Sequence, residues 1–235
     1  LVDQRNLILK KYWSLKAQEF TDNFNVAVEK TRYLVTDAVE RQLVSDVPLC
    51  TLLSGGLDSS IITAYASNYC KKHQMPTLNT FSVDYVDNDK NFVKSDFQPN
   101  SDKYYIDLMV NTFKTNHKTI VIDTPELVKE LDNACIARDF PGMADVDSSF
   151  LLFCKYIKPY ATVTLSGECA DEIFGGYPWF YKKELYSLDS FPWIRDIDQR
   201  LELLNENIKK LNIKEYVQSK YYQSLNEIDY LDQSF

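Results

Sequence analysis

The sequence predicts an α/β fold in which a doubly wound parallel sheet carries flanking helices on both faces. Short apolar segments with strand character alternate with longer segments whose apolar residues recur at helical spacing. Polar loops that contain glycine follow two of the predicted strands, and this alternation of strand and helix is typical of parallel sheets. The chain has 235 residues, 45% of them hydrophobic, which is enough to bury a core of this kind.

The individual elements follow from these patterns in chain order. Residues 19–44 are predicted to form one long amphipathic helix, because Phe24, Val28 and Val35 recur with helical spacing. Residues 46–53 are predicted to form a buried strand, which tolerates Pro48 because this residue lies near its beginning. The remaining predictions are helices over 59–72, 101–113, 126–137 and 147–156, and strands over 77–83, 119–122 and 161–165.

Two regions are less regular. Residues 84–102 are acidic and rich in asparagine, which favours a mobile surface loop. Beyond residue 181 the pattern is helical and polar, and the end at Phe235 is interpreted as a truncation. The sequence therefore predicts three segments: a linker with an amphipathic helix (1–46), a core (47–181) and a helical extension (182–235).

Composition excludes several classes of protein. The net charge of −8 argues against a protein that binds nucleic acid or a membrane surface, since either needs a basic face. No early segment is both long and apolar enough for a signal peptide or a membrane span. The five cysteines are widely spread and contain no C-x-x-C pair, which is typical of reduced thiols and predicts a cytoplasmic protein.

The first candidate site is the loop SGGLDSS, residues 54–60, after the strand that ends near Leu53. Such a loop would open at the carboxyl end of a parallel strand, where α/β sheets bind their ligands. Gly55 and Gly56 allow an anion to approach the backbone, and the helix that follows offers unpaired N–H groups. The hydroxyls of Ser54, Ser59 and Ser60 add donors, so the loop is a candidate phosphate site.

An alternative is that the glycines make only a tight turn and that Asp58 or Ser59 caps the next helix. The G-x-x-x-x-G-K-[ST] pattern of P-loop kinases and GTPases is absent from the sequence.

A second loop, SGECADEIFGGY over residues 166–177, follows the last predicted strand and should open at the same edge of the sheet. Asp58 and Asp171 would then supply two carboxylates, which suit Mg²⁺ when triphosphate and water complete its coordination. The alternative for Asp171 and Glu172 is a solvated first helical turn, where acids favour the positive end of the dipole.

These residues carry a resemblance to a known family. SGGLDSS resembles the pyrophosphate loop of the N-type ATP pyrophosphatases, which have the adenine nucleotide alpha hydrolase-like (HUP-type) fold. SGECADEIFGGYPWF, with the preceding DFPGMADVDSSFLL, resembles the synthetase domain of glutamine-hydrolysing asparagine synthetases. The resemblance covers roughly residues 47–181, and YWSL near Tyr12 resembles the linker before that domain.

The resemblance implies a role for each matching residue. Asp58 and Asp171 would hold Mg²⁺. Asp171 and Glu168 would be catalytic residues, and Glu168 would lie beside the reacting aspartate. Glu168 would act as a base toward ammonia or orient the loop, and the alternative is an ordinary acid at a helix amino end. The ATP pyrophosphate would lie on Ser54, Gly55, Gly56, Leu57, Asp58, Ser59 and Ser60, and the adenosine on backbone groups of Leu52, Val83 and Gly167.

The implied reaction activates the side-chain carboxylate of aspartate with ATP as an acyl-adenylate, releases pyrophosphate, and forms the amide when ammonia displaces AMP. The expected partners are aspartate, ammonia, a glutaminase domain of the same full-length chain and a second copy in a homodimer. The glutaminase domain is not expected within this chain, which begins at Leu1, and the family's transition-state lysine is expected beyond Phe235. Cys169 stands where a small residue is usual and is interpreted as a packing residue, as is the aromatic run from Tyr177 to Tyr181.

Two alternatives stay open at this point. The resemblance also extends to β-lactam synthetases and peptide macrolactam cyclases, which adenylate a carboxylate but use an internal amine. A nucleotide-binding module without turnover is the second alternative, against which the presence of Asp58, Asp171 and Glu168 counts.

Overall fold

The computed structural model describes residues 9–14, 19–94, 101–140, 142–185, 190–194 and 196–226. The chain divides into two compact units, one of residues 24–174 and one that combines residues 1–23 with 175–235. The first unit shares most of its residues with the predicted core.

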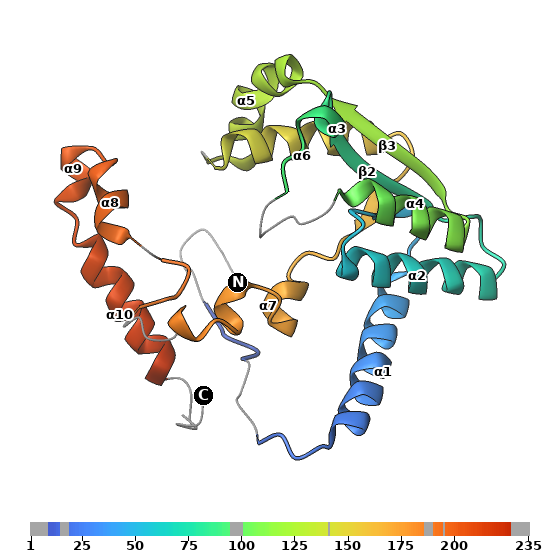
Figure 1. The fold of residues 1–235 in the computed structure, drawn as a ribbon, viewed down its shortest axis with the longest axis horizontal. Helices are drawn as coiled ribbons and strands as arrows, with labels where there is room; N and C mark the ends of the chain where they lie inside the picture. The colour runs from blue at the N-terminus through green and yellow to red at the C-terminus, as the bar shows by residue number, and fades with distance from the viewer. Residues whose placement is uncertain are drawn as a thin grey trace. The chain divides into compact units, whose positions relative to one another are not determined.

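The first unit contains a four-stranded parallel sheet with strand order β3-β2-β1-β4 (Figure 1). Its strands are β1 (Leu49–Leu52), β2 (Asn79–Tyr85), β3 (Asn116–Ile122) and β4 (Val163–Leu165). Its helices are α1 (Phe24–Gln42), α2 (Leu57–Lys72), α3 (Asn88–Asn91), α4 (Asp102–Phe113), α5 (Thr124–Arg138), α6 (Ala144–Ile157) and α7 (Ala170–Phe174).

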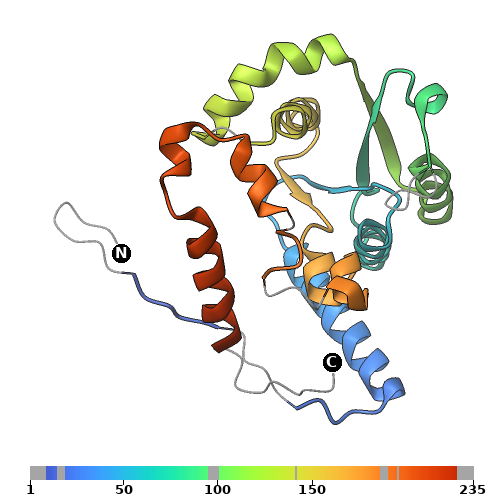
Figure 2. The same cartoon turned by 60° about the vertical axis from the view of Figure 1, so that its left-hand side comes forward.

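Successive side chains of β1 show that helices cover both faces of the sheet. Thr51 points toward α2, where its hydroxyl oxygen lies 2.9 Å from that of Thr63. Cys50 points the other way and packs against Phe153 and Ile157 of α6. Figure 2 shows α5 and α6 in yellow-green and yellow on one side of the sheet, and α2 and α4 on the other. The predicted α/β fold with a parallel sheet and flanking helices is therefore confirmed.

Each face has its own apolar core, which explains why β1 reads as a continuous buried strand. On the α2 side the core residues are Val39, Leu43, Ala66, Cys70, Leu78 and Leu165. On the α6 side they are Cys50, Phe81, Phe153, Ile157 and Ala161.

The pairing of β1 with β4 brings the two candidate loops to one edge. The strands are parallel, and Thr51 pairs with Leu165 near the end of each strand. Both strands therefore finish at the same level, and the loops that follow them leave side by side. This is the edge where parallel α/β sheets bind ligands.

Several element boundaries differ from those predicted. α1 begins at Phe24 rather than residue 19, and β3 begins at Asn116 rather than residue 119. α2 begins at Leu57, two residues before the predicted start, so Asp58 belongs to its first turn. The prediction of an irregular segment over 84–102 was wrong in part, because β2 continues to Tyr85 and α3 follows it; residues 95–100 lie outside the described residues.

The described residues of the second unit beyond Tyr181 are largely helical, as predicted for 182–235, and a first short 3-10 helix already begins at Pro178. The unit contains short 3-10 helices over Pro178–Phe180 and Lys183–Leu185, followed by α8 (Ile197–Glu202), α9 (Glu206–Lys209) and α10 (Ile213–Asn226). The predicted aromatic packing is present, since the Tyr177 and Trp179 rings stack with centroids 4.4 Å apart and Trp179 lies 6.1 Å from Trp193. Within the described part of the chain, every helix is too short or too polar to cross a membrane.

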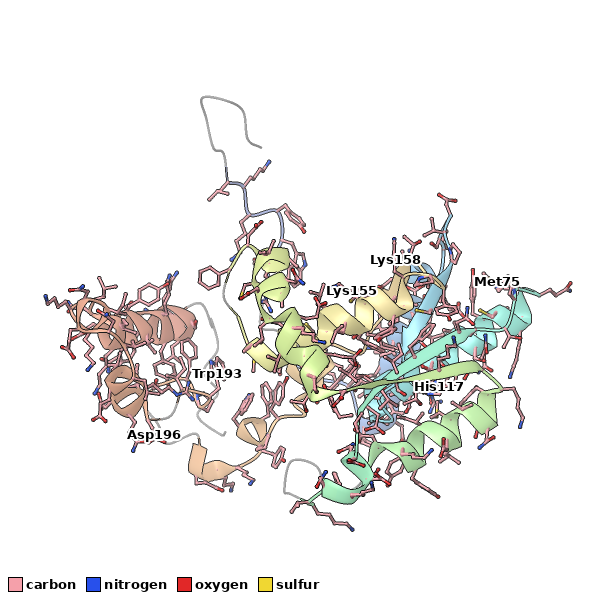
Figure 3. All side chains as sticks on the ribbon, turned by 90° about the horizontal axis from the view of Figure 1, so that it is seen from above. Met75, His117, Lys155, Lys158, Trp193 and Asp196 are labelled. Carbon is pink, nitrogen blue, oxygen red and sulfur yellow. The ribbon has the colours of Figure 1, made fainter. Side chains whose placement is uncertain are left out.

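A polar layer lies between β2, β3 and α4, on the side of the sheet where Figure 3 labels His117. The His117 Nδ1 atom lies 2.9 Å from the Thr80 hydroxyl, and Nε2 lies 3.1 Å from the hydroxyl of Ser82. Burial lowers the pKa of His117 because the charged ring loses hydration; Asp107 opposes this shift and Lys103 adds to it. Burial therefore favours the neutral form of His117 in the folded protein.

This network predicts a loss of stability in mild acid. The unfolded chain binds a proton at the ordinary pKa of 6.5, whereas the folded chain binds it only at lower pH. The stabilisation that comes from neutral His117 should be fully present above the ordinary pKa. It should be lost as the pH drops toward the folded pKa, because the unfolded state then binds more protons. Denaturant titrations at neutral pH and at about pH 5 should show this loss, and H117Q should reduce it. Equal pH dependence in both proteins would contradict the assignment.

Candidate nucleotide and metal site

The first loop turns sharply between β1 and α2. Gly55 has a backbone φ of +84°, a conformation that side chains other than glycine rarely adopt. A Cβ atom at Gly55 would also lie 2.7 Å from the carbonyl oxygen of Asp102, the first residue of α4. Gly56 is the N-cap of α2 and has no side-chain cap, so the alternative of a cap by Asp58 or Ser59 is wrong. The loop therefore presents backbone to the sheet edge.

Ser59 stabilises the conformation of this loop through hydrogen bonds to its backbone. Its side chain is buried, and its hydroxyl donates to the Gly56 carbonyl at 3.1 Å while accepting from the Ser54 N–H at 3.2 Å. The Ser54 and Ser59 hydroxyl oxygens are 3.0 Å apart. The sequence expectation that Ser59 contacts phosphate stays a prediction, but in this structure its hydroxyl is engaged within the loop.

Removing the Ser59 hydroxyl should therefore weaken nucleotide binding by disordering the loop. S59A is expected to lower ATP affinity about tenfold, the scale of one lost buried hydrogen-bonding group. S67A is the matched control, because Ser67 is also buried on α2 but donates to Phe113 at 3.3 Å, away from the loop. Calorimetry should show normal ATP affinity for S67A together with a lower free energy of unfolding; equal affinities for S59A and wild type would contradict the role of Ser59.

The second loop lies directly on the first turn of α2. A Cβ atom added to Gly167 would lie 2.9 Å from the Asp58 Cβ and 3.0 Å from the Ser59 backbone nitrogen. In Figure 1 the orange segment from β4 to α7 passes beside the teal amino end of α2. Two segments that are far apart in the sequence thus meet at the first turn of α2.

The two predicted metal-binding carboxylates are close enough to influence each other. The pKa of Asp58 is raised, first because the carboxylate is partly buried and second because the negative charge of Asp171 disfavours its ionised form. Asp58 is the second residue of α2, and Asp171 is the second residue of α7. The structure therefore places Asp58 and Asp171, the two predicted metal ligands, in neighbouring loops.

These two carboxylates fit a magnesium ion that is shared with a polyphosphate. They are hard oxygen ligands, and a cation bound by both would offset the repulsion from Asp171 that adds to the effect of burial on the pKa of Asp58. Among the described residues, no group of three or more His, Cys, Asp or Glu side chains could hold a metal. A metal here would accordingly depend on phosphate oxygens and water for most of its ligands.

The other predicted site residues lie around this centre. Leu52 ends β1 and lines a cavity of about 150 Å³ on the α6 side, smaller than the pockets that hold a whole nucleotide. Val83 lies on β2 and is 36% exposed. Leu57 and Ser60 occupy the first turn of α2, and Leu57 is 76% exposed. Glu168 is exposed, and its N–H donates to the Ser166 hydroxyl at 3.2 Å.

Two features of this region were not predicted from the sequence. Cys169 was interpreted as a packing residue, but the structure leaves it exposed with a φ of +70°, so that interpretation was wrong. Sequence reasoning also missed the support that Asp102 and Tyr105 of α4 give to Gly55, with a Cβ there lying 3.2 Å from the Tyr105 Cβ. Ser101 followed by Asp102 predicts the start of a helix, but nothing in the sequence indicates that this helix packs against Gly55.

Fold and site together define a parallel α/β domain with a glycine-containing loop and an acidic loop at the carboxyl edge of its sheet. The family model "Asparagine synthase" matches residues 30–234. The chain belongs to this family, which confirms the resemblance seen in its motifs.

Two curated relatives show how much of a longer protein the match covers. Asparagine synthetase [glutamine-hydrolyzing] 3 of Bacillus subtilis is 51% identical over 223 residues, 94% of this chain and 36% of the relative. Putative asparagine synthetase [glutamine-hydrolyzing] 2 of Methanocaldococcus jannaschii is 30% identical over 176 residues, 75% of this chain and 32% of the relative. The chain thus spans about a third of the length of these relatives.

A solved structure of the NH3-dependent NAD synthetase from Campylobacter jejuni, in complex with nitrate, also matches. It covers 86% of this chain and 93% of its own, with 11% identity and a TM-score of 0.33. A likeness of that size carries no argument about this chain.

Proposed function

We propose that this chain is the synthetase part of an ATP-dependent amide-forming ligase that converts aspartate to asparagine. The observation that supports the proposal is the close approach of Gly167 to the first turn of α2, which brings the two candidate loops side by side. The membership in the asparagine synthase family supports the reaction class.

In this proposal the ATP phosphates lie over residues 54–60. The amino end of α2, which begins after the exposed Gly56, offers N–H groups and partial positive charge, which a protein with a net charge of −8 must supply locally. Asp58 and Asp171 would hold Mg²⁺, which neutralises negative charge on the phosphates. Backbone groups of Leu52, Val83 and Gly167 are the proposed contacts of the adenosine.

The chemistry then has two steps. One oxygen of the aspartate side-chain carboxylate attacks the α-phosphorus of ATP, and the bond to the pyrophosphate oxygen breaks. Ammonia next attacks the carbonyl carbon of the acyl-adenylate, AMP leaves, and the nitrogen loses a proton as the amide forms. The chain contributes by positioning the reactants and by stabilising charge on the phosphates.

Glu168 is proposed to take the proton from the attacking nitrogen or to orient the loop. Its side chain is exposed beside Gly167, and its backbone N–H is tied to Ser166. A carboxylate in such a place is accessible to a substrate at the sheet edge.

The partners follow from the same proposal. Ammonia would come from a glutaminase domain of the full-length chain, in keeping with the words "glutamine-hydrolyzing" in the names of the relatives. A homodimer is a further proposal.

The free thiols, of which Cys50 and Cys70 are buried, favour a reducing compartment such as the cytoplasm.

Isotope exchange between pyrophosphate and ATP tests this function. With the full-length protein, exchange should require Mg²⁺ and aspartate and should not respond to a panel of other carboxylates. Exchange that depends instead on a substrate whose own amine can close a ring onto the activated carboxylate would favour the ring-forming alternatives. Tight ATP binding without any exchange would show a non-catalytic module.

A further inference from the structure

Gly167 is a glycine because of what lies against it, not because of its backbone conformation. Its φ is not among the positive values that the structure records, which among glycines belong to Gly55 and Gly175. A Cβ atom at Gly167 would instead meet the Asp58 Cβ at 2.9 Å, the Ser59 nitrogen at 3.0 Å and the Asp58 carbonyl carbon at 3.1 Å. Two of these three atoms are backbone, so no change of rotamer can make room for a methyl group.

The same residue anchors the helix that carries Asp171. The Gly167 carbonyl accepts a hydrogen bond from the Ala170 N–H at 3.2 Å, and Ala170 is the first residue of α7. Asp171 follows directly. A displacement of Gly167 away from α2 therefore carries the first turn of α7, and with it the Asp171 carboxylate, away from Asp58.

We propose that Gly167 is a positioning residue that sets the separation of the Asp58 and Asp171 carboxylates and thereby the size of the divalent cation they share. This inference rests on the proposed function. Mg²⁺ requires ligand distances of about 2.0–2.1 Å in near-octahedral geometry, whereas Ca²⁺ accepts about 2.3–2.6 Å and more flexible geometry. A wider pair of carboxylates should therefore lose Mg²⁺ more than Ca²⁺.

The test compares wild type with G167A in the full-length protein, with calorimetry of Mg²⁺ and Ca²⁺ binding in the presence of ATP. G167A is expected to lower Mg²⁺ affinity at least about tenfold, the scale of lost support for metal ligands, and to raise the ratio of Ca²⁺ to Mg²⁺ affinity. Binding of ATP in EDTA should change much less. S67A is the matched control, because Ser67 is buried on α2 but its hydroxyl donates to the Phe113 carbonyl at 3.3 Å, away from both loops; it should leave the ratio unchanged.

If circular dichroism shows that G167A does not fold, A170G takes its place, since it loosens the first turn of α7 without adding volume against α2. It should shift the ion ratio in the same direction. An unchanged ratio in the folded variant would overturn the inference. Wild-type protein that binds ATP with no dependence on a divalent cation would instead overturn the proposed metal site.

Discussion

Asp171→Asn is expected to lower the rate of aspartate-dependent pyrophosphate exchange at least about a hundredfold in the full-length protein, while the fold is preserved. The loss of one preorganised electrostatic contact typically costs about a hundredfold to a thousandfold in rate. Asp171 is partly exposed at the start of α7, so the nearly isosteric amide needs no repacking. Asp58→Asn should have an effect of similar size, because the two carboxylates are proposed to share one cation.

D171N also has a readout that does not depend on activity. The charge of Asp171 contributes to the raised pKa of Asp58, so its removal should move that pKa down toward the ordinary value. A titration of the Asp58 carboxyl by NMR would measure the change. The matched control is D107N, which removes an exposed carboxylate on α4 that is paired with Lys103 at 2.9 Å. An unchanged Asp58 pKa in D171N would mean that the two side chains are not neighbours.

Gly55→Val is expected to abolish measurable ATP binding. Valine is strained at a φ of +84°, and its Cβ would lie 2.7 Å from a backbone oxygen of α4. The loop or α4 would have to move, and either movement disturbs the backbone groups proposed to bind phosphate. The free energy of unfolding should also fall by about 1–3 kcal/mol, the usual cost of such strain.

The matched comparison is G56A, at the next position of the same loop. Gly56 has an extended conformation with a φ of −66°, and a methyl group there has room. G56A should accordingly lose far less ATP affinity than G55V. Calorimetry that finds similar affinities for G55V and wild type would exclude the loop as the phosphate site.

The sheet and its two loops could be predicted because their signals are local. Apolar strands such as Leu49–Leu52 alternate with helices at recognisable spacing, and a parallel sheet places the loops at one edge. The amphipathic pattern also located α5 and α6 to within a few residues. The pairing of Thr51 with Leu165 in the structure sets both loops at the same level, as that prediction requires.

The internal design of the site could not be predicted, because it depends on contacts between distant segments. Gly167 reads as one of several glycines in a motif, and its contact with Asp58 depends on how β4 pairs with β1. Ser59 reads as one more hydroxyl for phosphate, and its bond to the Gly56 carbonyl exists only because α2 begins at Leu57. Cys169 reads as apolar packing, and the turn that exposes it follows from the backbone of the loop.

Two loops distant in sequence are proposed to form one site for ATP and Mg²⁺. A crystal structure of the full-length protein with Mg²⁺ and a non-hydrolysable ATP analogue tests it most directly. The expected result is a polyphosphate over residues 54–60, with one cation bound by oxygens of both Asp58 and Asp171. A nucleotide bound elsewhere, or a cation held by neither carboxylate, would contradict it.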